Sequence, residues 1–170
     1  MDFKNIYLTG FMGSGKSTVG RILAKKMGFR FIDLDRVIEL AEGKKIKYIF
    51  KFEGEKYFRD LETKVIEKIY RNTNCVFACG GGIVKRRKNM DIIKSSSINV
   101  YLNISVRDAL ERLKYVKDRP LLEVGNRDKT IEKLIKERDV LYRKYADLVV
   151  INSKKDTEKT ADEIIAMLKA

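Results

Sequence analysis

The chain has 170 residues, of which 44% are hydrophobic and 36% are charged, and its formal net charge is +13. This length and composition predict one soluble globular domain, and no run approaches the roughly 18 apolar residues of a membrane span. The chain contains no histidine, which excludes catalysis by Ser-His or Cys-His pairs and by a histidine base. The N-terminal MDFKNIYLTG is not a secretory signal, so we expect a cytoplasmic protein that does not interact with membranes.

Short apolar runs rich in β-formers alternate with amphipathic helical patterns along the chain. The runs predict strands at 5–10, 29–35, 75–80, 98–103 and 147–152. The other patterns predict helices at 16–27, 36–42, 46–52, 55–71, 85–94, 105–116, 129–146 and 157–169. Ser105 is the expected N-cap of its helix, and Thr157 begins the last helix in an acidic first turn. The alternation predicts an α/β fold, a three-layer α/β/α domain over 1–170 with a five-stranded parallel sheet.

The first predicted strand leads into GFMGSGKST at 10–18, which matches the phosphate-loop motif G-x-x-x-x-G-K-[ST]. Glycines allow such a loop to aim successive backbone N–H groups at an anion, and the following helix directs its positive N-terminal end at the same place. The lysine reaches the β- and γ-phosphates and the serine offers its hydroxyl to Mg²⁺. The residues expected to bind the nucleotide are Gly13, Ser14, Gly15, Lys16, Ser17 and Thr18.

Two carboxylates, Asp33 and Asp35, end the second predicted strand. Because they are two residues apart on a strand, we expect both to point to one face, at the edge of the sheet where ligands bind. They could divide their work between Mg²⁺ and an acceptor hydroxyl. The alternative is that Asp35 only caps the next helix.

The helix predicted at 55–71 carries Arg59 and Glu62 within its apolar arc. A structural ion pair between these two residues is one explanation, and a binding site is the other. Three glycines, Gly80, Gly81 and Gly82, follow the next predicted strand, which indicates either a close approach of another group or a plain loop. The cysteines of that strand, Cys75 and Cys79, predict buried free thiols rather than a zinc site.

The basic segment 112–128 has little periodicity and contains the only proline, which follows Arg119. We interpret it as a lid that brings a charge-stabilising arginine to the phosphates, with an ordinary basic loop as the alternative. In the helix predicted at 129–146, Arg138 lies on the apolar stripe. It either pairs within the protein or faces a pocket that receives an anion.

The net charge of +13 raises the possibility of nucleic-acid binding. Only VKRRK at 84–88 is a compact basic cluster, and elsewhere acidic and basic residues are interleaved. We therefore favour a solvated surface, or attraction of polyanionic substrates such as nucleotide phosphates, and expect no nucleic-acid partner.

Together these stretches resemble the shikimate kinase family. The resemblance rests on GFMGSGKSTVG, FIDLD, IFKFEGEKYFRDLE, CGGG, RPLL and ERDVLYRKYADLVV, which occur in the family's order across residues 6–150. It implies a P-loop NTPase fold like that of the nucleoside monophosphate kinases. It also implies transfer of the γ-phosphate of ATP to the 3-hydroxyl of shikimate, in chorismate and aromatic amino-acid biosynthesis.

The resemblance implies roles for individual residues. Lys16 and Ser17 correspond to the phosphate and Mg²⁺ residues, Asp33 to the acid that assists Mg²⁺, and Asp35 to the residue that holds the substrate hydroxyl and accepts its proton. Arg119 corresponds to the lid arginine and Arg112 to a residue that stacks on adenine. The remaining substrate-binding set is Arg59, Gly80, Gly81, Gly82, Arg138, Phe50 and Phe58. The expected substrate-binding helical region is about 33–62 and the expected lid about 112–128.

The ligands expected from this resemblance are ATP, Mg²⁺ and shikimate, bound by a monomer. A related kinase of gluconate or of a nucleoside monophosphate is the alternative within the same class. A nucleic-acid-stimulated ATPase is the alternative from another class.

Overall fold

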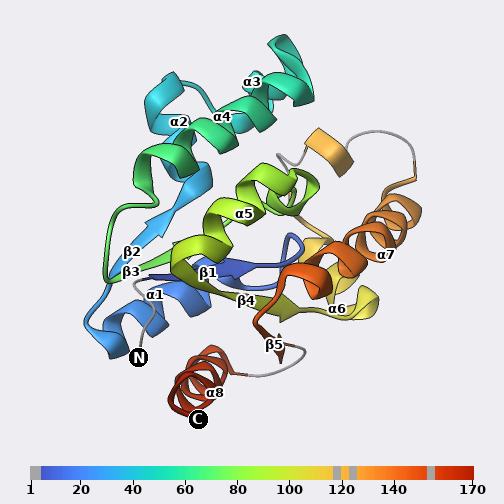
Figure 1. Cartoon of the computed structure of the whole chain (residues 1–170). Helices are drawn as coiled ribbons and strands as arrows, with labels where there is room; N and C mark the ends of the chain where they lie inside the picture. The colour runs from blue at the N-terminus through green and yellow to red at the C-terminus, as the bar shows by residue number, and fades with distance from the viewer. Residues whose placement is uncertain (1–4, 117–119, 123–125, 153–155) are drawn as a thin grey trace.

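The computed structural model describes residues 5–116, 120–122, 126–152 and 156–170. A five-stranded parallel sheet lies at its centre, in the order β2-β3-β1-β4-β5. The strands are β1 (Asn5–Thr9), β2 (Arg30–Asp33), β3 (Cys75–Ala78), β4 (Ser97–Asn103) and β5 (Leu148–Ile151). Helices cover both faces of this sheet (Figure 1), which confirms the predicted α/β/α class.

The helices follow the predicted alternation with the strands. They are α1 (Lys16–Met27), α2 (Leu34–Glu42), α3 (Ile46–Phe52), α4 (Gly54–Ile69), α5 (Arg87–Ser96), α6 (Val106–Leu113), α7 (Arg127–Tyr145) and α8 (Thr157–Lys169). Two short 3-10 helices, η1 (Ile83–Lys85) and η2 (Pro120–Leu122), complete the described elements. The bounds of α1, α3 and α8 are those predicted.

The central strand β1 is buried on both faces because its side chains alternate between two apolar clusters. Ile6 and Leu8 pack with α1 and α8 on one face of the sheet. Tyr7 belongs to the cluster on the other face and stacks on Phe77, its neighbour in the β1–β3 register, with ring centroids 4.4 Å apart. Burial of both faces explains why the strand reads as a continuous apolar run.

Some predicted boundaries were wrong for identifiable local reasons. The strand predicted at 29–35 ends at Asp33, because the Asp33 carboxylate accepts a hydrogen bond from the backbone N–H of Arg36 (3.3 Å) and starts α2. Ser105 caps α6 as predicted, accepting from the N–H of Asp108 (3.1 Å). The last helix begins at Thr157, but its N-cap is Asp156.

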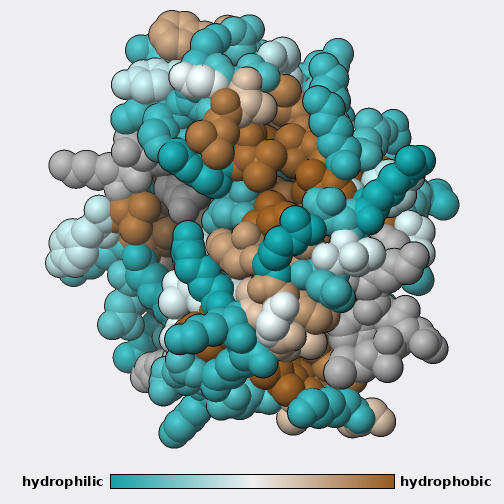
Figure 2. Space-filling view, turned by 90° about the vertical axis from the view of Figure 1, so that its left-hand side faces the viewer, coloured by the Kyte–Doolittle hydropathy of each residue, from teal (hydrophilic) through white to brown (hydrophobic). Residues whose placement is uncertain are grey.

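The carboxyl ends of the three adjacent strands β2, β3 and β1 meet at one edge of the sheet. They lead into Asp33, Gly80 and the phosphate loop respectively. Beyond this edge, α2, α3 and α4 form the upper part of the molecule in Figure 1. Figure 2 shows an apolar region at the height of these helices, bordered by hydrophilic side chains.

Two further sequence expectations concern the core and the surface. Cys75 and Cys79 are buried free thiols, as predicted. Among the residues that the structure describes, no helix is long and apolar enough to cross a membrane.

Candidate active site

The phosphate loop joins β1 to α1 and closes around its own lysine. Gly13 and Gly15 have φ angles of 80° and 89°, in the left-handed region that glycine adopts without strain. The Lys16 ammonium is largely buried and donates hydrogen bonds to the carbonyl oxygens of Gly10 (2.8 Å) and Phe11 (2.9 Å). α1 begins at Lys16, so its N-terminal N–H groups point toward the cavity beside the loop.

That cavity, the donor cavity, has a volume of about 410 Å³. Its lining includes the predicted nucleotide residues except Ser14, a fully buried residue of the loop, and Arg119, which lies outside the described residues. Its members from the prediction are Gly13, Gly15, Lys16, Ser17, Thr18 and Arg112. The Arg112 guanidinium donates to the carbonyl oxygens of Gly13 and Asn152, both at 3.0 Å, so it lies at the mouth of the loop.

Asn152 is a structural residue of this site that the sequence analysis did not identify. Its side-chain amide donates to the carbonyl oxygen of Ser14 (2.7 Å), and its oxygen accepts from the Thr160 hydroxyl (2.9 Å). The side chain is 1% exposed and ties the phosphate loop to β5 and α8. The only signal in the sequence was an asparagine directly after an apolar strand. Its hydrogen-bond partner in the phosphate loop is 138 residues away and its partner in α8 is 8 residues away, so no local pattern indicates either contact.

Ser17 and Asp33 meet at the boundary of the donor cavity. The Ser17 hydroxyl donates to the Asp33 carboxylate at 2.7 Å. The described residues contain no group of three or more acidic or cysteine side chains that could enclose a metal. One hydroxyl and one carboxylate suit Mg²⁺ that arrives with nucleotide phosphates and keeps several waters, so the donor set fits this ion.

The reason given for the position of Asp35 was wrong. Asp35 does not follow Asp33 along a strand; it lies in the first turn of α2, which Asp33 caps. The capping alternative was therefore also wrong for Asp35. Even so, Asp35 lines both the donor cavity and the adjoining acceptor cavity, as Asp33 does, so the turn into a helix brings both carboxylates to the same place.

Gly80 is where carboxylates approach the backbone after β3. A Cβ atom at this position would lie 2.7 Å from Asp35 Oδ1 and 2.7 Å from Glu62 Oε1. A side chain at Gly82 would overlap the guanidinium of Arg59. Gly80 and Gly82 thus allow a close approach of other groups, as one of the two interpretations predicted.

Arg59 forms the ion pair that was the structural alternative for this residue. Its guanidinium donates to Glu62 Oε2 (2.6 Å) and to Glu55 Oε1 (3.0 Å). Glu62 is 2% exposed, and burial raises the pKa of its carboxyl to about 7, while Arg59 acts in the opposite direction. Arg59 also lines the acceptor cavity, so the two interpretations are compatible.

Arg138 reaches the same cavity from α7. It is 4% exposed and donates to the carbonyl oxygen of Gly81 at 3.1 Å. The Tyr142 hydroxyl donates to the same oxygen. The side chain of Arg138, on the apolar stripe of α7, therefore reaches the Gly80–Gly82 segment, and Arg59 reaches the same segment from α4.

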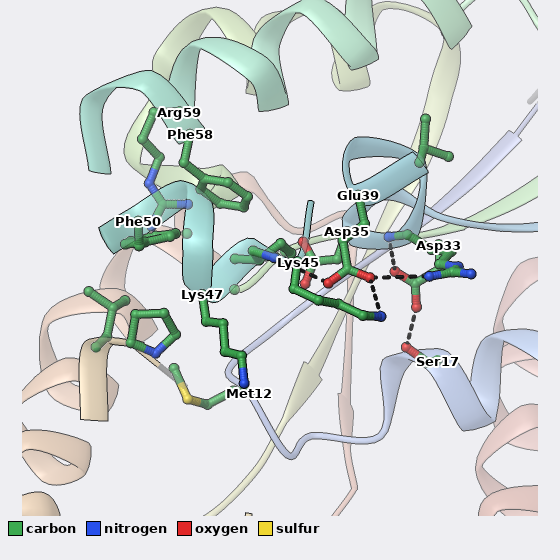
Figure 3. A pocket seen from close by; sticks show the side chains of 18 of the residues that line it. Met12, Ser17, Asp33, Asp35, Glu39, Lys45, Lys47, Phe50, Phe58 and Arg59 are labelled. Atoms are coloured by element: carbon green, nitrogen blue, oxygen red, sulfur yellow. Dashed lines mark hydrogen bonds and ion pairs between the residues drawn. The ribbon is translucent and has the colours of Figure 1, made fainter. Parts of the chain in front are cut away.

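The acceptor cavity has a volume of about 1050 Å³ and is lined by the whole predicted substrate set. Figure 3 shows four of these residues, Asp35, Phe50, Phe58 and Arg59. The rings of Phe50 and Phe58 form an apolar wall, with centroids 4.8 Å apart. The residues lining both cavities are Met12, Ser17, Asp33, Asp35 and Gly81. Of the expected lid, Pro120 and Leu121 line the acceptor cavity, whereas Arg119 lies outside the described residues.

The comparisons with known proteins agree with this geometry. The family model "Shikimate kinase" matches residues 12–169. The chain belongs to the shikimate kinase family. A shikimate kinase of a Sulfurihydrogenibium species is 45% identical over 98% of both chains, and that of Persephonella marina is 42% identical over 98% of this chain and 99% of its own.

Solved structures share the fold of this shikimate kinase family member. The shikimate kinase of Acinetobacter baumannii in complex with shikimate is 38% identical, covers 98% of this chain and 93% of its own, and has a TM-score of 0.95. A deoxyadenosine kinase of M. mycoides with bound dATP, at 17% identity and a TM-score of 0.63, shares the fold alone. The predicted family, fold and phosphotransferase class are confirmed.

Proposed function

We propose that this chain transfers the γ-phosphoryl group of ATP to the 3-hydroxyl of shikimate, within chorismate and aromatic amino-acid biosynthesis. The observation that carries the proposal is the junction of two cavities at Asp33 and Asp35, one beside a phosphate loop and the other containing two buried arginines. Such a junction allows direct transfer between a bound triphosphate and a bound anionic alcohol.

At the donor side, the loop supplies positive charge without covalent chemistry. Backbone N–H groups of the loop and of the first turn of α1 would hold the phosphates, and Lys16 would turn from the carbonyl oxygens of its own loop toward them. Arg112, already at the mouth of the loop, would lie against the nucleotide base. Mg²⁺, held by Ser17 and through water by Asp33, would neutralise charge on the β- and γ-phosphates.

At the acceptor side, two arginines define the end that binds a carboxylate. The guanidinium groups of Arg59 and Arg138 are both buried and both adjoin the Gly80–Gly82 segment. A planar carboxylate matches the bidentate geometry of guanidinium groups. Phe50 and Phe58 would pack against the carbocyclic ring of shikimate.

Asp35 would act on the hydroxyl that receives the phosphoryl group. It lines both cavities, so its carboxylate adjoins the path between donor and acceptor. From there it would orient the hydroxyl in line with the γ-phosphate and accept its proton. We propose that Arg119, on the lid at about 112–128, reaches the phosphates when the lid closes and that closure excludes water as a competing acceptor.

The observed ion pairs favour this function over a nucleic-acid-stimulated ATPase. The basic cluster that suggested nucleic acid is matched by carboxylates: Lys85 pairs with Glu55, Arg86 with Asp60, Arg87 with Asp91 and Lys88 with Glu67. Such pairing weakens a phosphate-binding surface.

We propose that the monomer is the working unit, because residues of one chain build both cavities. The buried free thiols support a reducing, cytoplasmic location.

The decisive experiment is ADP release measured with ATP and Mg²⁺, with and without shikimate. We expect release to require shikimate, and mass spectrometry to detect shikimate 3-phosphate in equal amount. Gluconate and nucleoside monophosphates serve as alternative acceptors in the same assay. ADP release that is independent of shikimate, or faster with another acceptor, would contradict the proposal.

A further inference from the structure

Asp139, the residue after Arg138, attaches α7 to strand β4. Its Oδ1 atom accepts hydrogen bonds from the Tyr101 hydroxyl (2.7 Å) and from the side-chain amide of Asn103 (3.1 Å). The Asn103 amide also donates to the Tyr101 hydroxyl oxygen (3.2 Å), so Tyr101, Asn103 and Asp139 form a closed set, which we call the α7 anchor. The Oδ2 atom of Asp139 accepts from Arg143 (2.8 Å). Asp139 therefore directs one oxygen to the sheet and the other to its own helix.

The ring of Tyr101 belongs to the same attachment. α7 packs on β4 (Figure 1), and Tyr101 is 2% exposed and stacks on Tyr142 of α7, with ring centroids 4.9 Å apart. Burial and the hydrogen bond to Asp139 raise the pKa of Tyr101, so its hydroxyl stays protonated and continues to donate at neutral pH. Tyr101 pairs in register with Thr9 of the central strand β1. The anchor thus joins α7 to the centre of the sheet.

The same part of α7 presents the groups that reach the acceptor cavity. Arg138 precedes Asp139, and both Arg138 and Tyr142 donate to the carbonyl oxygen of Gly81. Arg59, the other arginine of the cavity, is held by two carboxylates of its own helix. Arg138 instead donates to the backbone of another segment, so the position of its guanidinium depends on where α7 lies.

We propose that the α7 anchor positions Arg138 to bind the carboxylate of the acceptor. The structure describes all three residues of the anchor, and none of them lines either cavity, so they are positioning residues that act through α7. The inference rests on the proposed function. Its physical basis is that a bidentate contact between guanidinium and carboxylate is directional, so a helix that shifts or rotates weakens it.

Tyr101→Phe tests the anchor because it removes one hydroxyl and keeps the stacked ring. Steady-state ADP release by the full-length chain would give kcat and the KM for shikimate and for ATP, and thermal unfolding would be measured in parallel. We expect the shikimate KM to rise about three- to tenfold, the effect of losing one hydrogen bond, while the ATP KM and kcat stay within about twofold. Asn103→Ala removes the second donor and should raise the same KM, which provides the test if Tyr101→Phe does not fold.

Asp139→Asn and Ser97→Ala are the controls. Asparagine keeps an oxygen that can accept from both donors of β4, so its shikimate KM should stay within about twofold of the wild type. Ser97 lies at the other end of β4, and its hydroxyl donates to the carbonyl oxygen of Ile93 in α5 (2.9 Å). Ser97→Ala therefore also removes one hydroxyl from β4, but it does not loosen α7, so both KM values should stay within about twofold.

A double substitution tests whether the anchor acts through Arg138. In Arg138→Ala the shikimate KM is already raised, and no guanidinium remains to be positioned. Adding Tyr101→Phe to this variant should therefore raise the shikimate KM by less than about a further twofold, so that the two effects are not additive.

The outcomes separate this inference from the proposed function. Wild-type protein whose ADP release does not respond to shikimate would refute the proposed function. If the wild type is active, an unchanged shikimate KM in Tyr101→Phe or an equal rise of both KM values would show that the anchor only stabilises the fold. Either result, additive effects in the double variant, or a control that behaves like Tyr101→Phe would overturn the inference.

Discussion

Replacement of Glu62 by glutamine should change how the stability of the domain depends on pH. Glu62 Oε2 accepts a hydrogen bond from Arg59, while Oε1 is buried without a hydrogen-bond partner among the described residues. Burial raises the pKa of this carboxyl from 4.5 to about 7, Asp35 acts in the same direction, and Arg59 and Arg138 oppose it. In the folded protein the neutral form is thus favoured over a wider pH range than in the unfolded chain.

The sign and size of the effect follow from this difference. A carboxyl whose pKa is higher in the folded state binds its proton more tightly there, so it adds stability below 4.5 that is lost as the pH rises through about 7. The whole difference corresponds to about 3 kcal/mol in the free energy of unfolding. Between about pH 5.5 and about pH 8, the loss should be about 2 kcal/mol. No histidine titrates in this window, because the chain has none.

Urea unfolding at several pH values between these limits would measure the effect. Glutamine keeps an oxygen that can accept from Arg59 but cannot ionise, so the free energy of unfolding of Glu62→Gln should lack the decline seen in the wild type. Glu55→Gln is the control, because Glu55 pairs with the same arginine but is partly exposed. Burial raises the pKa of Glu55, but Lys85 and Arg59 outweigh it and lower the pKa overall.

The stability that Glu55 contributes is therefore present above 4.5 and lost only as the pH falls through its lower folded pKa. Glu55→Gln should run parallel to the wild type across the window. Parallel curves for wild type and Glu62→Gln would refute the reasoning, since they would show that Glu62 does not change its protonation on unfolding there.

Three further substitutions test the roles assigned to the acceptor cavity. Arg138→Ala removes a buried guanidinium and should raise the shikimate KM about 10- to 100-fold while the ATP KM stays within about twofold; an unchanged shikimate KM would exclude a carboxylate contact. Asp35→Asn should lower kcat about 100-fold or more with a smaller effect on KM, and near-normal turnover in the ADP-release assay would remove it as the base. Gly82→Ala adds a methyl group that overlaps Arg59, while the backbone there (φ −104°) is ordinary. It should raise the shikimate KM about tenfold and leave thermal unfolding within a few degrees of the wild type; the reverse pattern would indicate a purely structural glycine.

Local patterns predicted the elements of the fold well where the cause is local. The helical period and the apolar runs predicted the observed bounds of α1, α3 and α8. The boundary at Asp33 was missed because an aspartate after an apolar run can either belong to the end of the strand or cap the next helix. The hydrogen bond from the backbone N–H of Arg36 shows that Asp33 caps the helix. The position of Asp35 was therefore anticipated for the wrong reason.

The ion pairs show where prediction from the sequence stopped. The spacing of Arg59 and Glu62 permitted a pair within one helix, and that pair is present. The spacing could not reveal that Asp35 approaches the same place at Gly80, because that contact joins α2 to the end of β3. Nor could it reveal Asn152, whose partner in the phosphate loop is 138 residues away.

By itself, the sequence determined the phosphate loop, the alternation of strands and helices, and the family. These depend on short motifs and on periodicity, which are properties of neighbouring residues. Only the tertiary structure decided that α2, α4 and α7 direct Asp35, Arg59 and Arg138 to one cavity. The order β2-β3-β1 is the physical reason, because it places the ends of three strands far apart in sequence at one edge of the sheet.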